Sequence, residues 1–296
     1  MRIRYLWNLK MKVGLIRVDG KFPNLALMKL SSWHKKRGDD VVLIDFSDMD
    51  LDRIYASNVF IGGPGYDLKA KLPDEIEHCK PDYDLFATDF SIGFTSRGCI
   101  RNCKFCIVRA KEGHIREHAD LEEFVDDRYE KVILMDNSFL ASPKWKEKLQ
   151  KIIDKKWKVN FSQGLDLRLV NDENAQVLSK VKSYDWRFKK RRLHFAWDSM
   201  KDEKKIIEGL DIILKYIPPH QIMVYVLIGF DTTLEQDLYR INKLIKIGVK
   251  PFVMRYNNKR DPILRHLSRW INQRFYEVCS WDEYLAKKML KRTQRQ

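Results

Sequence analysis

The chain has 296 residues, 44% hydrophobic and 33% charged, a composition typical of a folded domain that excludes a disordered chain. No apolar run approaches the roughly 20 residues that cross a bilayer, and no apolar segment precedes a small-residue cleavage site near the start, so we expect no membrane span, no secretory signal and a cytoplasmic location. The formal net charge of +15 favours an anionic partner, above all nucleic acid, through counterion release.

The first 63 residues alternate apolar runs with amphipathic stretches. Apolar runs predict strands at 13–18, 41–46 and 58–63, and the spacing of apolar residues predicts a helix over 24–37 and a short helix over 47–56. This order predicts a small doubly wound α/β domain of the flavodoxin or Rossmann kind. Residues 64–90 are rich in proline, aspartate and lysine, and we interpret them as a connector.

A second series of apolar runs begins at Ser91. It predicts strands at 91–95, 131–136, 158–163, 192–197, 221–230 and 250–256, with helices between them, for example at 144–157 and 234–248. The strand starts lie close to the ~30 residues apart that repeated βα units need. Six units are too few for a closed eight-stranded barrel. Residues 91–258 therefore predict a partial (β/α)6 barrel with its active face at the carboxyl ends of the strands, and residues 259–296 predict a basic helical extension.

Three of the five cysteines follow the first strand of this second series. Cys99, Cys103 and Cys106 lie within eight residues, in the spacing Cys-x3-Cys-x2-Cys. A tight group within an odd number of cysteines indicates a metal site and not a disulfide framework. Cysteine thiolates are the usual ligands of iron–sulfur clusters. Three ligands on a four-iron cluster leave one iron open to a substrate, and Gly98 permits a tight turn before them.

The segment GFTSRGCIRNCKFCIVRAKEG (93–113) resembles the CxxxCxxC loop of the radical S-adenosylmethionine (SAM) superfamily, including the aromatic residue before the third cysteine. The resemblance implies a [4Fe–4S] cluster held by the three cysteines, SAM on the open iron, and reductive cleavage of SAM to a 5′-deoxyadenosyl radical. It also implies a reductant such as a flavodoxin or a ferredoxin. Phe105 would shield the cluster and pack against the adenine.

The order of an α/β domain followed by a barrel resembles the subgroup of that superfamily that carries a cobalamin-binding domain. Segments 61–67, 161–169, 194–199 and 224–233 strengthen this resemblance. The Asp-x-His-x-x-Gly signature of an axial cobalamin histidine is absent, since Asp19-Gly20-Lys21-Phe22 stands in its place, and His34 is the only histidine among the first 77 residues. We therefore expect no histidine-ligated cobalamin, and only cobalamin binding without a protein ligand stays open.

Polar residues at the predicted strand ends are the further site residues that the resemblance implies. The expected cofactor contacts are Phe105, Asp136, Asn137, Gln163, Arg168, Asp198 and Gly229. The expected substrate contacts are Asp166, Trp197, Arg255 and Tyr256. Arg168 could hold the methionine carboxylate of SAM in a fork, or it could form an internal pair with Asp166. For the others, helix capping, turns and ordinary packing are the alternatives.

Two basic segments, 186–192 and 287–295, complete the candidate features. Aromatic residues among cations in the first segment suit stacking on single-stranded bases, so we expect tRNA or single-stranded nucleic acid as partner and substrate. A solvated charged face is the alternative, with a peptide or small metabolite as substrate. A non-enzymatic nucleic-acid-binding protein with structural zinc is the third hypothesis, with Cys79, His114 or His118 as the fourth ligand. The oligomeric state stays open.

Overall fold

The computed structural model describes residues 10–18, 23–45, 50–57, 73–256 and 261–293, and it divides into two units. Unit 1 comprises residues 1–95 and 117–135, and unit 2 comprises residues 96–116 and 136–296. Both units are mixed α/β structures with parallel strands. The division falls after Thr95, whereas the sequence placed domain boundaries at residues 63 and 91.

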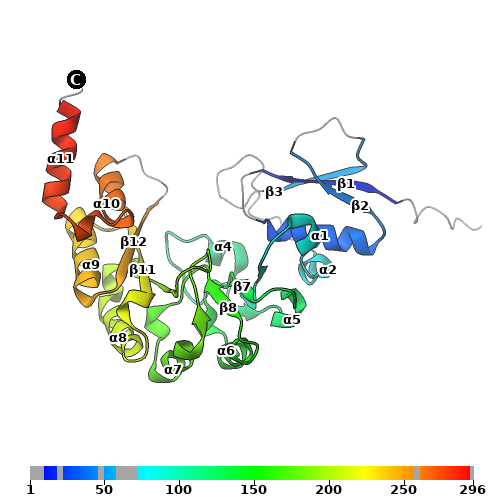
Figure 1. The fold of residues 1–296 in the computed structure, drawn as a ribbon, viewed down its shortest axis with the longest axis horizontal. Coiled ribbons are helices and arrows are strands. Elements are labelled where there is room, and N and C mark those ends of the chain that lie inside the picture. Colours follow the sequence, from blue (N-terminus) through cyan, green and yellow to red (C-terminus); the bar gives the residue numbers. More distant parts are fainter. Residues whose placement is uncertain (1–9, 19–22, 46–49, 58–72, 257–260, 294–296) are drawn as a thin grey trace, which may run out of the picture. The chain divides into compact units, whose positions relative to one another are not determined.

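Unit 1 contains a parallel sheet with β1 (Lys12–Arg17) between β2 (Asp40–Leu43) and β3 (Arg53–Ser57). Figure 1 shows α1 (Leu25–Lys36) packed along this sheet. The apolar run of β1 and the apolar face of α1 are buried against each other, which confirms the predicted strand–helix–strand start of the chain. Asn24 begins α1 because its side chain accepts a hydrogen bond from the Leu27 amide at 3.3 Å.

The predicted helix over 47–56 is wrong for the part that the structure describes. Residues 53–57 form β3, which pairs in parallel with β1 and places Arg53 opposite Val13. Ten residues with five apolar positions do not distinguish a strand from a helix. Pairing with the edge of β1 decides for the strand here. The predicted strand at 58–63 and the segment 61–67 lie outside the described residues, as do residues 19–22.

The rest of unit 1 consists of short helices and short strands. They are α2 (Asp74–Glu77), α3 (Tyr83–Phe86), β4 (Ser91–Gly93), α5 (Leu121–Phe124) and β7 (Lys131–Leu134). β4 and β7 pair in parallel, with Ile92 opposite Ile133. The described part of the predicted connector therefore carries two short helices, and the hydroxyl of Tyr83 donates a hydrogen bond to the Phe124 carbonyl at 2.5 Å.

His34 lies in the core of unit 1, fully buried on α1. Its Nδ1 lies 2.6 Å from an Asp39 carboxylate oxygen, and its Nε2 lies 3.1 Å from the hydroxyl of Tyr55. Both ring nitrogens are therefore engaged within the unit. His34 is a structural histidine of the fold, and it does not offer an axial ligand for cobalamin.

Unit 2 carries most of the strand–helix repeats. In chain order they are β5 (Ser96–Arg97), α4 (Val108–Glu112), β6 (Arg116–Glu117, at the sequence boundary of the units), α6 (Trp145–Asp154), β8 (Lys158–Phe161), α7 (Asp172–Lys180), β9 (Lys182–Ser183), β10 (Leu193–Ala196), α8 (Glu203–Leu214), β11 (Ile222–Ile228), α9 (Leu234–Ile247), β12 (Lys250–Arg255), α10 (Pro262–Asn272) and α11 (Trp281–Thr293). The strands predicted at 158–163, 192–197, 221–230 and 250–256 are confirmed, with boundaries that differ by at most two residues.

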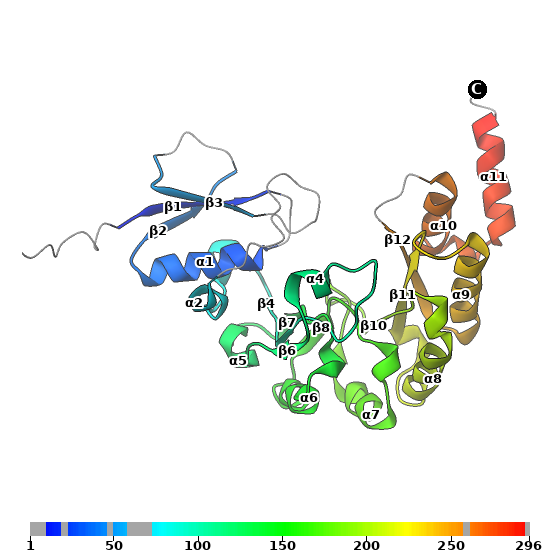
Figure 2. The same ribbon diagram turned by 180° about the vertical axis from the view of Figure 1, so that it is seen from behind.

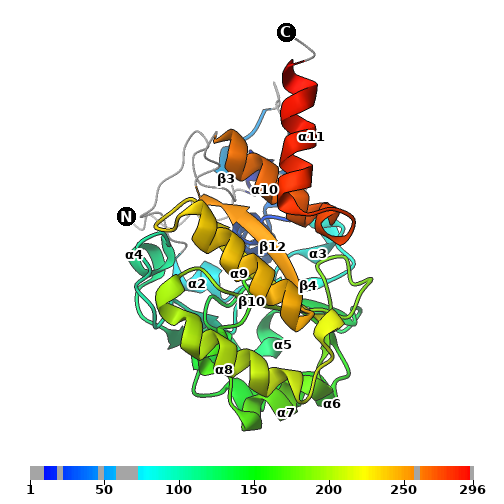
Figure 3. The same cartoon turned by 90° about the vertical axis from the view of Figure 1, so that its left-hand side faces the viewer.

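Parallel pairing orders the strands of unit 2. β11 lies between β10 and β12, and β8 pairs with β9. The segment after β8 joins β10, since the Leu165 amide donates to the His194 carbonyl at 2.7 Å. Alternate residues of β11 are fully buried, and α8 and α9 lie side by side next to these strands (Figures 2 and 3). Among the described residues, no helix has the length and apolar character to cross a membrane.

We predict that His194 makes folding pH-dependent. Its ring is 5% exposed, stacks 5.6 Å from the Tyr225 ring, and burial lowers its pKa to about 4. As pH falls from about 6.5 towards 4, His194 becomes protonated in the unfolded chain but stays neutral in the folded chain. The free energy of unfolding of the wild type therefore falls by up to about 3 kcal/mol across this window, relative to His194→Gln.

Urea unfolding of the two proteins at several pH values measures this difference. Because both proteins keep every other titrating group, the difference between them isolates His194. Parallel pH dependence of the two curves between pH 7 and 4 would contradict the prediction.

Candidate active site

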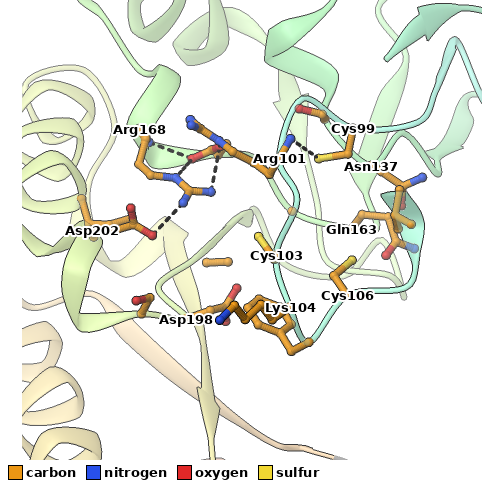
Figure 4. A pocket seen from close by; sticks show the side chains of 18 of the residues that line it. Cys99, Arg101, Cys103, Lys104, Cys106, Asn137, Gln163, Arg168, Asp198 and Asp202 are labelled. Atoms are coloured by element: carbon orange, nitrogen blue, oxygen red, sulfur yellow. Dashed lines mark hydrogen bonds and ion pairs between the residues drawn. The ribbon is translucent and has the colours of Figure 1, made fainter. Parts of the chain in front are cut away.

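The three cysteines lie on a loop, residues 98–107, between β5 and α4 of unit 2. Gly98 has φ +81°, and a Cβ there would collide with the His114 carbonyl, so the turn requires glycine. The Cys99 amide donates to the Gly113 carbonyl at 3.3 Å, and the Cys106 amide donates to the Cys103 carbonyl at 3.0 Å. This backbone folds the loop back on itself. Figure 4 shows Cys99, Cys103 and Cys106 along it.

Glu112, at the end of α4, fixes the start of this loop. One carboxylate oxygen accepts hydrogen bonds from the Gly98 amide at 3.0 Å and from Nδ2 of Asn137 at 3.1 Å. The other oxygen pairs with Arg97 at 3.3 Å. A single half-buried carboxylate therefore joins the first turn of the cysteine loop to Asn137, which lines the same cavity.

A cavity of about 360 Å³ lies beside the loop, and we call it the cysteine cavity. The segments after β8, β10 and β11 form much of its wall, so it lies at the carboxyl ends of these strands, where parallel α/β folds bind ligands. In Figure 4 the cysteines lie on one side and Arg168 and Asp202 on the other. Its polar lining comprises Cys99, Arg101, Cys103, Lys104, Cys106, Asn137, Ser138, Gln163, Asp166, Arg168, Asp198, Ser199, Lys201, Asp202 and Asp231.

All five cysteines are free thiols. Burial raises the pKa of Cys103 and of Cys106, and the neighbouring thiols raise it further, so both thiols are protonated at neutral pH without a cation. Among the described residues, no three His, Cys, Asp or Glu side chains come together as a group that could hold a metal ion. The loop does bring three thiols to one cavity, and cysteine thiolates are the usual ligands of iron–sulfur clusters.

The three residues proposed as a fourth zinc ligand do not line this cavity. Cys79 lies in unit 1, buried, with its thiol 3.3 Å from the Glu75 carbonyl. The Nε2 atom of His118, also in unit 1, lies 3.7 Å from a Glu77 oxygen. His114 contacts the guanidinium of Arg109. The cavity therefore offers the three loop thiols and none of these three candidates, whereas a structural zinc site requires four ligands.

Arg168 forms the internal pair with Asp166, one of the two roles that the sequence left open for it. Its guanidinium donates to both carboxylate oxygens of Asp166, at 2.7 and 3.0 Å, and to Asp202 at 2.7 Å. Arg101 also donates to Asp166 at 3.0 Å. Burial by itself raises the pKa of Asp166, but Arg168 and Arg101 hold it below its usual range. The fork of Arg168 is thus occupied, and Asp166 is a fixed negative charge in the cavity wall.

Asp198 is the second carboxyl group with a distinct environment in this wall. It follows β10, and its Oδ1 accepts a hydrogen bond from the Leu227 amide at 3.3 Å. Burial raises its pKa to about 6, far above that of Asp166. The two carboxyl groups therefore differ in charge at weakly acidic pH, and Asp198 can hold or release a proton near pH 6.

Aromatic rings form the apolar part of the cavity. Phe105, from the cysteine loop, packs edge-on against Phe230 with ring centroids 5.6 Å apart. Phe230 in turn packs against Tyr256 at 4.8 Å. Both phenylalanines line the cavity, while Tyr256 lies outside its lining and contacts Phe230. These rings make this part of the cavity wall apolar, although the third cysteine, Cys106, is itself exposed.

The structure places the other predicted residues in different positions. Gln163 lines the cavity. Asp136 is buried away from the lining, with one oxygen accepting hydrogen bonds from the backbone and hydroxyl of Ser96. Trp197 is a fully buried core residue whose indole donates to the Ser199 carbonyl at 3.0 Å. Gly229, at φ +76°, and Arg255 also lie outside the lining.

Sequence analysis missed several residues that the structure brings to the cavity. They are Arg101, Lys104, Lys201, Asp202, Phe230 and Asp231. Arg101 and Lys104 lie between the cysteines of the loop, and Phe230 and Asp231 follow Gly229 directly after β11. Their positions next to residues that the sequence analysis had chosen as candidates were the available signal. Asp202 gave no such signal, because it reaches Arg168 from the start of α8.

A buried ion pair on α9 fixes the ends of two strands beside the cavity. Arg240 is fully buried and donates to the Trp197 carbonyl at 2.6 Å and to the Leu227 carbonyl at 2.7 Å. It also pairs with Asp237 on the same helix, which accepts a hydrogen bond from Thr232 at 2.6 Å. The guanidinium thus joins β11 to the residue that precedes Asp198.

No family model matches the chain, and no curated protein gives a significant match to it.

We predict that Arg240→Met lowers the free energy of unfolding by about 3 to 5 kcal/mol, because it leaves the Asp237 carboxylate buried without its partner. The double variant Arg240→Met/Asp237→Leu regains part of this loss. It removes the uncompensated charge, but the Trp197 and Leu227 carbonyls still lack their donor. Urea unfolding measures both variants, and a loss below about 1 kcal/mol for the single variant would show that the pair is not structural.

Proposed function

We propose that this chain is a radical SAM enzyme in which Cys99, Cys103 and Cys106 hold a [4Fe–4S] cluster. The observation that carries the proposal is that three thiols from one loop line one cavity, while none of the three candidate fourth ligands does. The resemblance of the loop to the CxxxCxxC motif supports the same chemistry. A cluster with three protein ligands leaves one iron for the amino and carboxylate groups of SAM.

When bound, such a cluster supplies the electron that breaks the sulfonium carbon–sulfur bond of SAM, giving methionine and a 5′-deoxyadenosyl radical. The residues of the chain position and protect these groups. Phe105 and Phe230 form the apolar part of the cavity wall next to the cysteine loop, where the adenine of SAM would pack. The Arg168 and Asp166 pair supplies fixed charges on the opposite wall. Asp198, with its pKa near 6, holds or releases a proton beside the bound substrate.

We further propose that the parallel strand–helix units belong to a partial (β/α)6 barrel and that the first strands form a flavodoxin-like domain. The carboxyl ends of β8, β10 and β11 at the cysteine cavity support the barrel. The order β2-β1-β3 with α1 supports the α/β domain. A flavodoxin or ferredoxin would deliver the electron.

The substrate class we propose is a nucleic acid or a nucleobase derivative. The net charge of +15 supports it, because a chain of this charge attracts polyanions. A peptide or a small metabolite is the alternative substrate. Retention of tRNA or single-stranded nucleic acid that weakens as salt rises separates the two, and its absence favours the alternative.

We predict that the wild-type chain, reconstituted anaerobically with iron and sulfide, becomes brown and absorbs near about 400 nm. With dithionite and SAM it then releases 5′-deoxyadenosine and methionine. Cys99→Ala, Cys103→Ala and Cys106→Ala each lose one cluster ligand, so their 5′-deoxyadenosine yield falls to the level without enzyme. Absorbance, iron content and liquid chromatography measure these results.

Cys79→Ala and Cys279→Ala are the matched controls. Each also removes one thiol, but their sulfur atoms contact the Glu75 and Phe275 carbonyls away from the cavity. Both controls keep the cluster and the activity. A colourless chain that retains zinc through the loop cysteines would instead identify the non-enzymatic zinc protein.

A further inference from the structure

Residues 184–191, between β9 and β10, form a hairpin. Tyr184 and Arg191 pair in antiparallel fashion at its base. The Asp185 amide donates to the Lys190 carbonyl at 2.9 Å, and the Asp185 carboxylate accepts the amides of Lys189 and Lys190 at 2.9 and 3.3 Å. The one carboxylate of the hairpin is therefore used to hold its turn.

The hairpin presents an aromatic ring among cations. Trp186 is 53% exposed, and the guanidinium of Arg187 lies 4.7 Å from its ring centroid. Lys189 and Lys190 are exposed on the same turn. An exposed indole beside three cations combines a stacking surface with phosphate contacts.

A hollow of about 180 Å³ lies beside the base of this hairpin. Its polar lining, among the described residues, comprises Ser179, Ser183, Arg191, Arg192, Tyr216 and Gln221 and no carboxylate. Arg192 is only 6% exposed, and one of its nitrogens donates to the His220 carbonyl at 3.2 Å. A buried arginine in a hollow without carboxylates provides a site for an anion.

Positive charge gathers around Arg192. Burial lowers its pKa, Asp185 opposes that change, and Arg274 adds to it. Burial also lowers the pKa of Lys250, and Arg192, Arg274 and Lys190 lower it further. Of the two nearby carboxylates, Asp185 holds the hairpin turn and Glu277 pairs with Arg274 at 2.7 Å. The excess of cations favours a polyanion.

We propose that the hairpin 184–191 and the hollow beside it bind a single-stranded nucleic acid, with a backbone phosphate at Arg191 and Arg192 and a base stacked on Trp186. A strand fits better than an acidic peptide because every nucleotide joins a base that stacks on an exposed indole to a phosphate that pairs with a cation. The exposed side chains Arg187, Lys189 and Lys190 contact neighbouring phosphates.

This surface and the cysteine cavity lie at opposite ends of the same strands. The hairpin leads into the amino end of β10, and Lys250 begins β12, whereas Asp198 and Phe230 follow the carboxyl ends of β10 and β11. The seven residues of β11 span about 23 Å. A nucleic acid that reaches both sites is therefore several nucleotides long. That the bound strand is also the substrate rests on the proposed function, whereas its binding at the hairpin does not.

Fluorescence anisotropy with labelled polyuridylate, on the full chain with and without reconstitution, tests this surface. Arg187→Glu/Lys189→Glu/Lys190→Glu weakens binding by more than tenfold and reduces the slope of log affinity against log salt by about 2, because three phosphate contacts are lost. Trp186→Ala weakens binding by about tenfold and leaves the salt slope unchanged, since stacking releases no counterions.

Lys144→Glu/Lys204→Glu/Lys205→Glu is the matched control, with the same change in net charge at exposed lysines away from the hairpin. It weakens binding by less than about threefold, and circular dichroism verifies that every variant folds. Equal weakening by the two triple variants overturns the proposal. So does absence of binding at low salt, or competition by polyglutamate as strong as by unlabelled polyuridylate. Because binding is measured without a cluster, its failure is distinct from failure of SAM cleavage.

Discussion

Arg240 lies on α9 with no exposed surface, and its guanidinium donates to main-chain carbonyls at the ends of two neighbouring strands. Burying a guanidinium is costly unless its charge and its donors are matched. Asp237 balances the charge and the two carbonyls accept from the terminal nitrogens, whereas the buried Nε has no hydrogen-bond partner. The same contacts fix where Asp198 follows β10. The position of the cavity wall therefore depends on a buried ion pair that does not itself line the cavity.

The cavity combines fixed charges with adjustable ones. Arg168 and Arg101 share Asp166, and the contacts of Arg168 with Asp166 and Asp202 occupy its fork, which is not free for an incoming carboxylate. Burial raises the pKa of Cys103, Cys106 and Asp198, so the two thiols stay protonated at neutral pH and Asp198 titrates near pH 6. Binding of a metal cluster would stabilise the thiolates and release their protons.

The excess positive charge of the chain is distributed unevenly over unit 2. At the cysteine cavity, arginines are paired with carboxylates. At the opposite ends of the strands, Arg191 and Arg192 border a hollow whose described lining contains no carboxylate. The cysteine cavity and the hollow at Arg191 and Arg192 therefore lie at opposite ends of the strands. The first is suited to chemistry, and the second is suited to binding a polyanion. An α/β unit allows this, because the two ends of its parallel strands carry different loops.

The sequence by itself determined the elements and the cysteine loop. Buried parallel strands are continuous apolar runs, and cysteine spacing is local, so β8, β10, β11, β12 and the three thiols could be predicted from short segments, whereas the two-residue strand β9 was not predicted. Tertiary structure decided that residues 53–57 form a strand, because the edge of β1 was available. It also decided the contact between Arg101 and Asp166, which lie 65 positions apart, and the burial that separates Asp198 from Asp166. Pairing and burial depend on which chain segments meet in space, and no local pattern of residues carries that information.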